Sequence, residues 1–392
     1  MRVKSGSVNI REVARVAQVG VATVSRVING SDLISRRTRE RVQAVIRRLG
    51  YRPNAQARRI LGHSQMICFV LANRPFLHSF HAGVLQGAET AASELNHHVV
   101  FLRIDVEKKT PPDQILLPPI LEEKGWVDGV IVSGAVYPNL ISRIKALGLP
   151  LVVFGNNVFD VSGQSGLDQV RYNGTRAEFE ATKYLINLGH RLISFVGDIE
   201  YPWFCDQYGG YLKALRTSTL NPIALTGKGP GTFVEYGRWA AECLLKGKRV
   251  ATAILAGNDE IAYGLCRSFR RLRVRIPDDI SLIGFDDREI AAVMDPPLTT
   301  VQVCAPEIGR CCMELLVERL RNPSQGVSTR LVHTRLVERE SVQSKLGPSE
   351  ESGRQSLRLS RTAGPPESAR ASNQGGGDIS LRGWSPALAS RK

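Results

Sequence analysis

The sequence predicts an all-α helix-turn-helix head followed by an α/β core of two doubly wound parallel-sheet lobes. Apolar stripes at helical spacing fill the first fifty residues, and strand-like apolar runs then alternate with helical stretches. A core of about 280 residues is too large for one sheet, so two lobes are expected. The predicted parts are a head at 1–53, a connecting segment at 54–62, a core at 63–344 and a tail at 345–392.

The head is expected to contain three short helices. Asn9 followed by Glu12 resembles a capping box and places the start of the first helix. The run 18–20 (Gln-Val-Gly) is typical of a tight turn, and 21–27 predicts a second helix with two valines facing inward. The third helix is expected over 35–49, because a serine can cap its start and a glycine follows its end.

The positive charge of the chain is concentrated at its two ends. Residues 1–62 contain 14 Lys and Arg against 3 Asp and Glu, and residues 345–392 contain 8 against 4, whereas the middle is balanced. In a helix-turn-helix motif the second helix enters the major groove, where Arg26 could pair with guanine while Thr23 and Ser25 suit phosphates. This pattern indicates DNA binding. The alternative is a generic three-helix bundle with a solvated basic face.

Several function classes are disfavoured by the sequence. No apolar run reaches the length of about 18 residues that a membrane span needs, and the N-terminus has no apolar signal-peptide core, so a cytoplasmic location is expected. The 7 cysteines follow no metal-ligand spacing, which predicts reduced thiols and no metal. The 7 histidines belong to no recognisable triad, P-loop or metal motif, so we expect neither an enzyme nor a cofactor.

The core alternates between strand-like and helix-like segments. The expected strands are Met66–Leu71, Val99–Leu102, Val130–Ser133, Leu151–Phe154, Leu192–Val196, Ala253–Ala256 and Ser281–Phe285. The expected helices lie near 80–96, 113–124, 174–189, 206–219, 232–247, 258–272 and 306–321.

Polar residues follow many of these strands, at the end where ligands of open α/β sheets bind. The rule nominates the positions 73–76, 155–156, 197–198, 258–259 and 286–287. The alternative for each Asn or Asp is that it only caps the next helix. Their convergence at strand ends nevertheless predicts a pocket among them.

Two runs in the head, NIREVARVAQVGVATVSRVING and TRERVQAVIRRLGYRPNAQARRI, resemble the lactose/galactose repressor (LacI/GalR) family. The core contains further matching pieces, which are VDGVIVSG, NLGHRLISFVGD, AGNDEIAYGL, RIPDDISLIGFDD and PPLTTV. The resemblance covers about residues 8–342. It implies a repressor that binds near-palindromic operator DNA as a homodimer, with a core shaped like periplasmic sugar-binding proteins. A sugar-like effector bound between the lobes would control operator affinity.

The resemblance also implies roles for individual residues. Val21 and Ala22 would set operator preference, and residues 54–61 would form a hinge helix that drives Ile60 into the minor groove. The full set of implied DNA contacts is Val21, Ala22, Thr23, Ser25, Arg26, Asn29, Asn54, Ala57 and Ile60. The implied ligand contacts are Phe76, Asn156, Trp203, Gln207, Asn258 and Asp286.

The sequence departs from the family pattern in four places. Gly20 replaces the usual Ser before the second helix and Ile60 the usual Leu wedge. Asp206 and Gln207 stand where members often have an Arg, and Gly155-Asn156 replaces another family-typical Arg or Asp. Losing the bidentate guanidinium disfavours an anionic ligand and favours a neutral or cationic one.

The Ser-, Gly- and Arg-rich residues 345–392 are expected to be disordered, because they offer little apolar surface to bury.

The alternative function is a ligand-binding module of transport type, which the core alone would permit. The basic head and the missing signal peptide argue against it.

Overall fold

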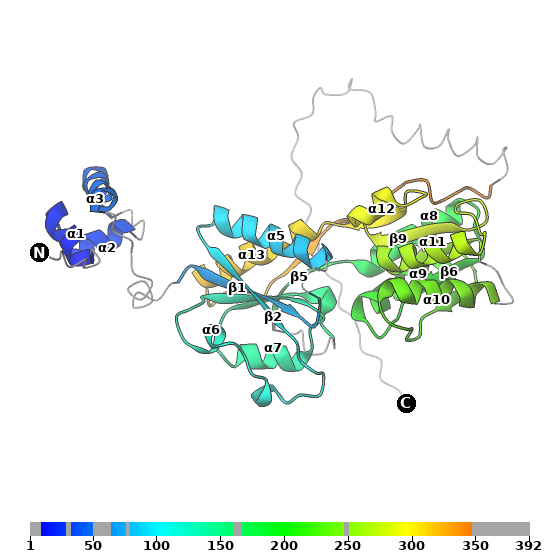
Figure 1. Ribbon diagram of the computed structural model, residues 1–392, viewed down its shortest axis with the longest axis horizontal. Helices are drawn as coiled ribbons and strands as arrows, with labels where there is room; N and C mark the ends of the chain where they lie inside the picture. The colour runs from blue at the N-terminus through cyan, green and yellow to red at the C-terminus, as the bar shows by residue number, and fades with distance from the viewer. Residues whose placement is uncertain are drawn as a thin grey trace, which may run out of the picture. The chain divides into compact units, whose positions relative to one another are not determined.

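The computed structural model describes residues 9–28, 33–49, 64–75, 79–159, 166–246 and 251–346. Within these ranges it contains the three helices of the head and two α/β lobes (Figure 1). The predicted tail at 345–392 lies almost wholly outside the described residues, as does the whole predicted hinge at 54–62.

The head folds as the sequence predicts. Its helices are α1 (Ile10–Ala17), α2 (Val21–Ile28) and α3 (Arg36–Leu49). The Asn9 Oδ1 atom accepts a hydrogen bond from the Glu12 N–H at 3.0 Å, which caps α1. Gln18 takes the left-handed conformation with φ 52° and turns the chain between α1 and α2. The core of the head consists of Val13, Ala14, Ala17, Val24, Val27, Val42 and Val45.

The sheet of the first lobe has the strand order β11-β5-β4-β3-β1-β2, and all of its paired strands are parallel. The strands are β1 (Met66–Ala72), β2 (His98–Ile104), β3 (Gly129–Gly134), β4 (Leu151–Phe154), β5 (Asp168–Tyr172) and β11 (Thr329–Val332).

Helices cover both faces of this sheet (Figure 1). On one face lie α5 (Ser79–Glu94) and α13 (Ala305–Arg321), and on the other lie α6 (Pro119–Glu122) and α7 (Pro138–Lys145). Alternate residues of β1 therefore serve two cores: Phe69 packs with α5 and α13, whereas Val70 packs with α6 and α7. A Cβ at Gly87 would lie 1.8 Å from the Pro306 carbonyl oxygen, so this glycine permits the close crossing of α5 and α13.

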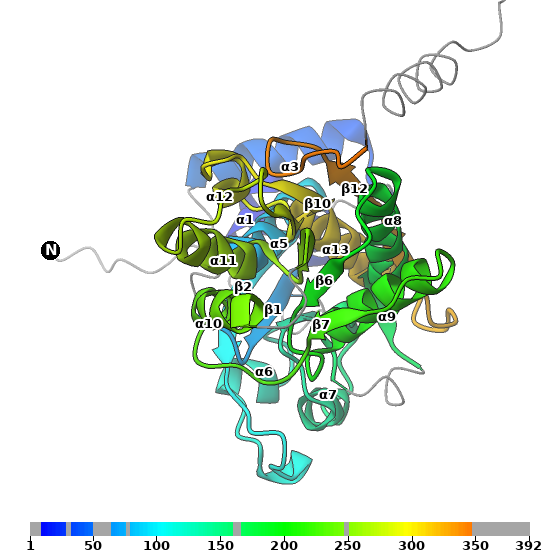
Figure 2. The same ribbon diagram turned by 90° about the vertical axis from the view of Figure 1, so that its right-hand side faces the viewer.

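The sheet of the second lobe has the order β12-β10-β9-β8-β6-β7 and is parallel except for the antiparallel pair β10–β12. Its strands are β6 (Ile193–Val196), β7 (Ile223–Leu225), β8 (Ala253–Ala256), β9 (Ser281–Asp286), β10 (Thr299–Val303) and β12 (Thr334–Val337). Figure 2 shows α8 and α9 on one side of the sheet, with α10 and α11 on the other. These helices are α8 (Gly174–Asn187), α9 (Pro202–Arg216), α10 (Phe233–Lys246) and α11 (Asp259–Arg271), and the short α12 spans Glu289–Val293.

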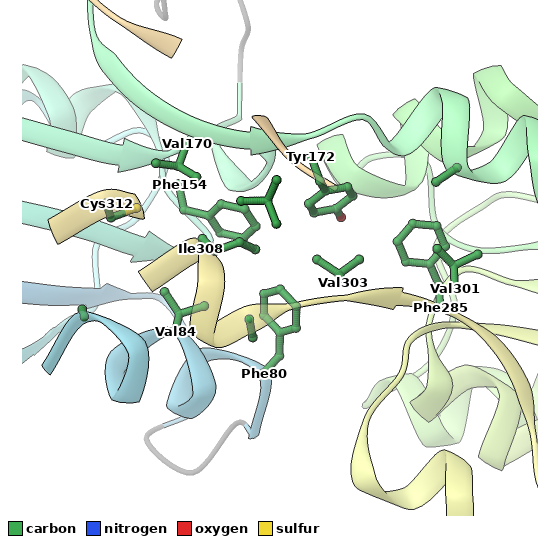
Figure 3. Packing of buried hydrophobic residues seen from close by; sticks show 14 of the residues in the cluster. Phe80, Val84, Phe154, Val170, Tyr172, Phe285, Val301, Val303, Ile308 and Cys312 are labelled. Carbon is green, nitrogen blue, oxygen red and sulfur yellow. The ribbon is translucent and has the colours of Figure 1, made fainter. Parts of the chain in front are cut away.

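The chain crosses between the lobes after β5, after β10 and between β11 and β12. Aromatic rings connect the lobes beside these crossings: Tyr172 lies 6.1 Å from Phe154 in the first lobe and 5.9 Å from Phe285 in the second, measured between ring centroids (Figure 3). The hydrophobic core is therefore continuous from one lobe to the other.

The two-lobed parallel fold is confirmed, with differences in detail. The predicted helix at 113–124 is wrong: the segment contains the 3₁₀ turn η1 (Pro112–Gln114) and the four-residue α6, because prolines at 118 and 119 interrupt a helix. The helices α7 and α12 and the strands β5, β7, β10, β11 and β12 were not predicted. Polar residues interrupt the apolar run in β5, β10, β11 and β12, whereas β7 is apolar but only three residues long.

Candidate functional site

The second helix of the head presents a distinct outer face. Val24 and Val27 are buried against α1 and α3, as predicted. Val21 is 42% exposed, and Ala22 and Arg26 are exposed as well. A helix that buries Val24 and Val27 and turns Arg26 outward has the form needed to enter a groove of DNA.

The other predicted DNA contacts are only partly described. Thr23 and Ser25 are half-buried on α2. Asn29, Asn54, Ala57 and Ile60 lie outside the described residues, as does the predicted ligand residue Phe76. Their roles stay predictions.

A small, partly open cavity of about 30 Å³, with room for about one water molecule, lies at the strand ends between the two lobes. It is lined by Arg74, Phe80, His81, Asn157, Tyr172, Trp203, Phe233, Asn258 and Asp286. These residues follow or end β1, β4, β5, β8 and β9, together with the starts of α5, α9 and α10. Three of the five nominated strand ends, those that contain Arg74, Asn258 and Asp286, contribute to this cavity, and its role in ligand binding stays a prediction.

Aromatic rings form the wall of the cavity on the second lobe. The centroids of the Tyr201 and Trp203 rings lie 4.8 Å apart, and the centroid of the Phe233 ring lies 5.7 Å from that of Tyr201. Phe159, which follows η2 (Gly155–Asn157) at the end of β4, packs at 6.2 Å from Trp203. Such a wall offers flat apolar faces on which a ring or a planar group can stack.

Acidic groups close the cavity at the end of β9. Asp286 has φ 103°, a backbone conformation that a non-glycine residue adopts only at an energetic cost. Desolvation, followed by the neighbouring Asp259 carboxyl, raises the pKa of Asp286 well above its ordinary range. Asp259 is fully buried and accepts hydrogen bonds from Thr300 Oγ1 at 2.6 Å and the Arg288 N–H at 2.7 Å. Burial raises its pKa to about 7 despite these bonds.

Three of the predicted ligand residues line the cavity: Trp203, Asn258 and Asp286. Asn258 also caps α11, because its Oδ1 accepts from the Ile261 N–H at 2.9 Å. The two interpretations weighed for this residue therefore both fit the structure.

Two predicted ligand residues are buried but do not line the cavity. The amide of Asn156 is used by the backbone of Tyr172, accepting from its N–H at 2.9 Å and donating to its carbonyl at 3.0 Å. The neighbouring Asn157 lines the cavity in its place. Gln207 lies buried on α9, and its Oε1 atom has no hydrogen-bond partner among the residues that the structure describes.

The sequence reasoning missed Arg74. Its Cζ atom lies 4.9 Å from the centroid of the Trp203 ring and 5.5 Å from that of Phe233. The range 73–76 was nominated as a strand end, but nothing local indicated which side chain reaches the opposite lobe. The expectation of a neutral or cationic ligand was based on the missing Arg near Asp206, and the structure brings another guanidinium into the cavity.

Other site types are not seen among the residues that the structure describes. No group of His, Cys, Asp or Glu side chains there could hold a metal ion. No helix in the same ranges is long and apolar enough to cross a membrane.

Comparison with known proteins gives two family matches. Residues 9–54 match the family "Bacterial regulatory proteins, lacI family", and residues 182–342 match the "Periplasmic binding protein-like domain". Catabolite control protein A from Priestia megaterium is 32% identical over 317 residues, which cover 80% of this chain and 92% of the relative. The HTH-type transcriptional repressor CytR from Escherichia coli K12 is 29% identical over 336 residues, 85% of this chain and 96% of the relative.

The transcriptional regulator CelR in complex with cellobiose has a similar solved structure. Its TM-score is 0.62 at 27% sequence identity, and the match covers 85% of this chain and 99% of that one. The similarity extends through the head and both lobes, so it applies to the whole architecture. The chain therefore belongs to the LacI family of bacterial regulatory proteins, DNA-binding transcription regulators with an effector-binding core.

Proposed function

We propose that this chain represses transcription as a homodimer on a near-palindromic operator, and that a small sugar-like molecule bound between the lobes controls its operator affinity. The observation that carries the proposal is the pairing of an arginine-bearing outer face on α2 with a cavity between two lobes. A regulator of this kind acts on chromosomal DNA, which supports a cytoplasmic location and a binding function in place of catalysis.

The reading of DNA is assigned to α2 and the predicted hinge. Arg26 is exposed and can form a bidentate pair with the O6 and N7 atoms of guanine. Val21 and Ala22 lie beside it at the start of α2 and can contact base edges or thymine methyl groups. Thr23 and Ser25 suit the phosphates, and Asn29, Asn54, Ala57 and Ile60 remain assigned by family resemblance alone.

A homodimer follows from the symmetry of the proposed operator. Two half-sites related by a two-fold axis are bound by two heads related by the same axis. In solution, full-length protein should therefore sediment as a dimer without DNA.

The lobes provide a means of coupling ligand to DNA. The Arg288 Nε atom in the second lobe donates to Ser79 Oγ on α5 of the first lobe at 2.7 Å. Arg288 also forms an ion pair with Glu260 at 2.7 Å, which holds the guanidinium in place. A ligand that separates or realigns the lobes must rearrange this contact, so its binding energy can favour one lobe arrangement over another.

The experiment measures binding of full-length protein to a library of near-palindromic duplexes at fixed salt concentration. The wild type should prefer a defined palindrome over scrambled duplexes. Arg26→Ala should cost about 1–3 kcal/mol at one base pair of each half-site and relax the preference there. Arg26→Lys is the matched control, because it keeps the charge but loses the bidentate fork.

Two outcomes would contradict the proposal. An Arg26→Ala protein with unchanged base preference removes Arg26 from the reading set. A wild type with no preference for any palindrome contradicts operator binding itself. For the effector, a thermal-shift screen of sugars, polyols and nucleosides should find a stabilising compound whose effect is lost in Asp286→Ala.

A further inference from the structure

The loop after β1 directs Arg74 across the cavity. Asn73 takes a left-handed conformation with φ 51°. Its Oδ1 atom accepts from the Val106 N–H at 2.7 Å, and its Nδ2 atom donates to the Ala135 carbonyl at 2.8 Å. The backbone in front of Arg74 is therefore held on both sides, and the arginine side chain leaves the first lobe in a defined direction.

The guanidinium of Arg74 lies among rings of the second lobe. Besides Trp203 and Phe233, the Tyr201 ring lies 5.8 Å from its Cζ atom. Within the described residues Arg74 forms no ion pair, and its buried Nε has no hydrogen-bond partner. Desolvation lowers the pKa of Arg74. Electrostatic interactions with Tyr201, Glu260 and Asp286, none of which pairs directly with the guanidinium in the described residues, act in the opposite direction and raise it.

A half-buried guanidinium that packs on rings, with no anionic partner among the described residues, is only partly stabilised. Ring faces attract the cation, but they leave the buried Nε–H without an acceptor. A carboxylate or a phosphate presents two oxygens in the geometry of the guanidinium fork and would satisfy these donors. A cationic ligand, in contrast, would meet a like charge at the same rings.

The other cavity residues compensate the charge of Arg74 only in part. Asp286 is the acidic side chain of the lining; it forms no ion pair with Arg74 in the described part of the chain, and desolvation raises its pKa. A protonated carboxyl can donate a hydrogen bond to a ligand oxygen. Asn157 and Asn258 add amide groups that suit hydroxyls or carbonyls.

The cavity has room for about one water molecule, so a larger ligand has to separate the lobes or move the Arg74 side chain off the rings. We propose that Arg74 anchors an anionic oxygen group, a carboxylate or a phosphate, of the molecule that the cavity binds, while Trp203 and Phe233 stack on the remainder. This proposal rests on the proposed function, because it assigns a ligand class to the same effector site.

The test titrates full-length protein with matched probes and follows thermal stability at constant ionic strength. The probes are glucose, glucuronate and glucose 6-phosphate, then ribose and ribose 5-phosphate, with inorganic phosphate alone as the control for general anion binding. A carboxylate or phosphate probe should bind at least about tenfold more tightly than its neutral parent. The carboxylate and phosphate arms identify which of the two anionic groups the site takes.

Variants separate Arg74 from general electrostatics. Arg74→Gln should weaken binding of the anionic probe by at least about tenfold and leave the neutral parent unchanged. Arg74→Lys should retain part of the phosphate affinity but lose more of the carboxylate affinity, because lysine has no planar fork. Arg216→Gln removes an exposed charge at the end of α9 and should change neither.

Three results would overturn the assignment: neutral parents that bind as tightly as their acids, an Arg74→Gln protein that keeps the anionic affinity, or a wild type that none of the charged sugars stabilises beyond inorganic phosphate. Operator binding is measured in parallel. An acid that binds through Arg74 but leaves operator affinity unchanged contradicts control by the effector and leaves the role of Arg74 intact.

Discussion

Glu178 on α8 allows a quantitative test of how burial affects this fold. Its side chain is 2% exposed, and its Oε1 atom has no hydrogen-bond partner in the described ranges of the chain. Desolvation raises the pKa of Glu178 from the ordinary 4.5 to about 8. The substitution Glu178→Gln keeps the shape of the side chain and removes the titration.

The sign of the effect follows from proton binding. The folded protein holds a proton on Glu178 at pH values where the unfolded chain has released it, so stability falls as pH rises between the two pKa values. Each pKa unit corresponds to about 1.36 kcal/mol. The stability present below pH 4.5 and lost by pH 8 is therefore about 5 kcal/mol, of which about 3 kcal/mol is lost between pH 5.5 and 7.5.

Urea unfolding of full-length wild type and Glu178→Gln at pH 5.5, 6.5 and 7.5, followed by far-UV circular dichroism, measures this loss. The stability of the variant relative to the wild type should rise by about 3 kcal/mol across the series. Buried acids common to both proteins cancel in this difference. Glu180→Gln, two residues along the same helix and half-exposed beside Arg176, is the control and should show no such trend. A difference that is constant across pH would refute the reasoning.

Three further substitutions test the packing and the caps. Asn9→Ala should cost about 1 kcal/mol of head stability by removing the α1 cap, and operator titrations should show weaker binding that Asn9→Asp restores. Gly87→Ala should lower the melting temperature, because its Cβ would meet a backbone carbonyl of α13, whereas Gly209→Ala in open space on α9 should be neutral or stabilising. Arg319→Met should cost about 3–5 kcal/mol in chemical denaturation, because it leaves Asp168 buried and unpaired; an equal loss in an Asp168→Asn, Arg319→Met double variant would exclude this cause.

The head was predictable almost residue by residue. Its caps, turn and inward-facing valines are local signals, because each depends on neighbours within one or two helical turns. The central parallel strands of the core were also predictable from local sequence, because a strand that is buried on both faces needs a continuous apolar run. Strand β5 was missed because its Gln169 and Arg171 are half-exposed and interrupt that run.

The candidate ligand site was predictable in place but not in chemistry. Strand ends meet at one edge of each sheet, so Asn258 and Asp286 could be nominated from the sequence. Asn156 and Asn157 could not be told apart from the sequence, because tertiary packing decides which amide faces the Tyr172 backbone and which lines the cavity.

The sequence by itself determined the class of this protein, through the periodicity of its apolar residues, the charge of its head and its family motifs. Only the tertiary structure decided the charge of the pocket. Arg74 and Trp203 lie in different lobes, and no local pattern relates them. They meet because parallel strands of two sheets end at the same cleft, and the closure of the lobes puts a guanidinium of one against the rings of the other.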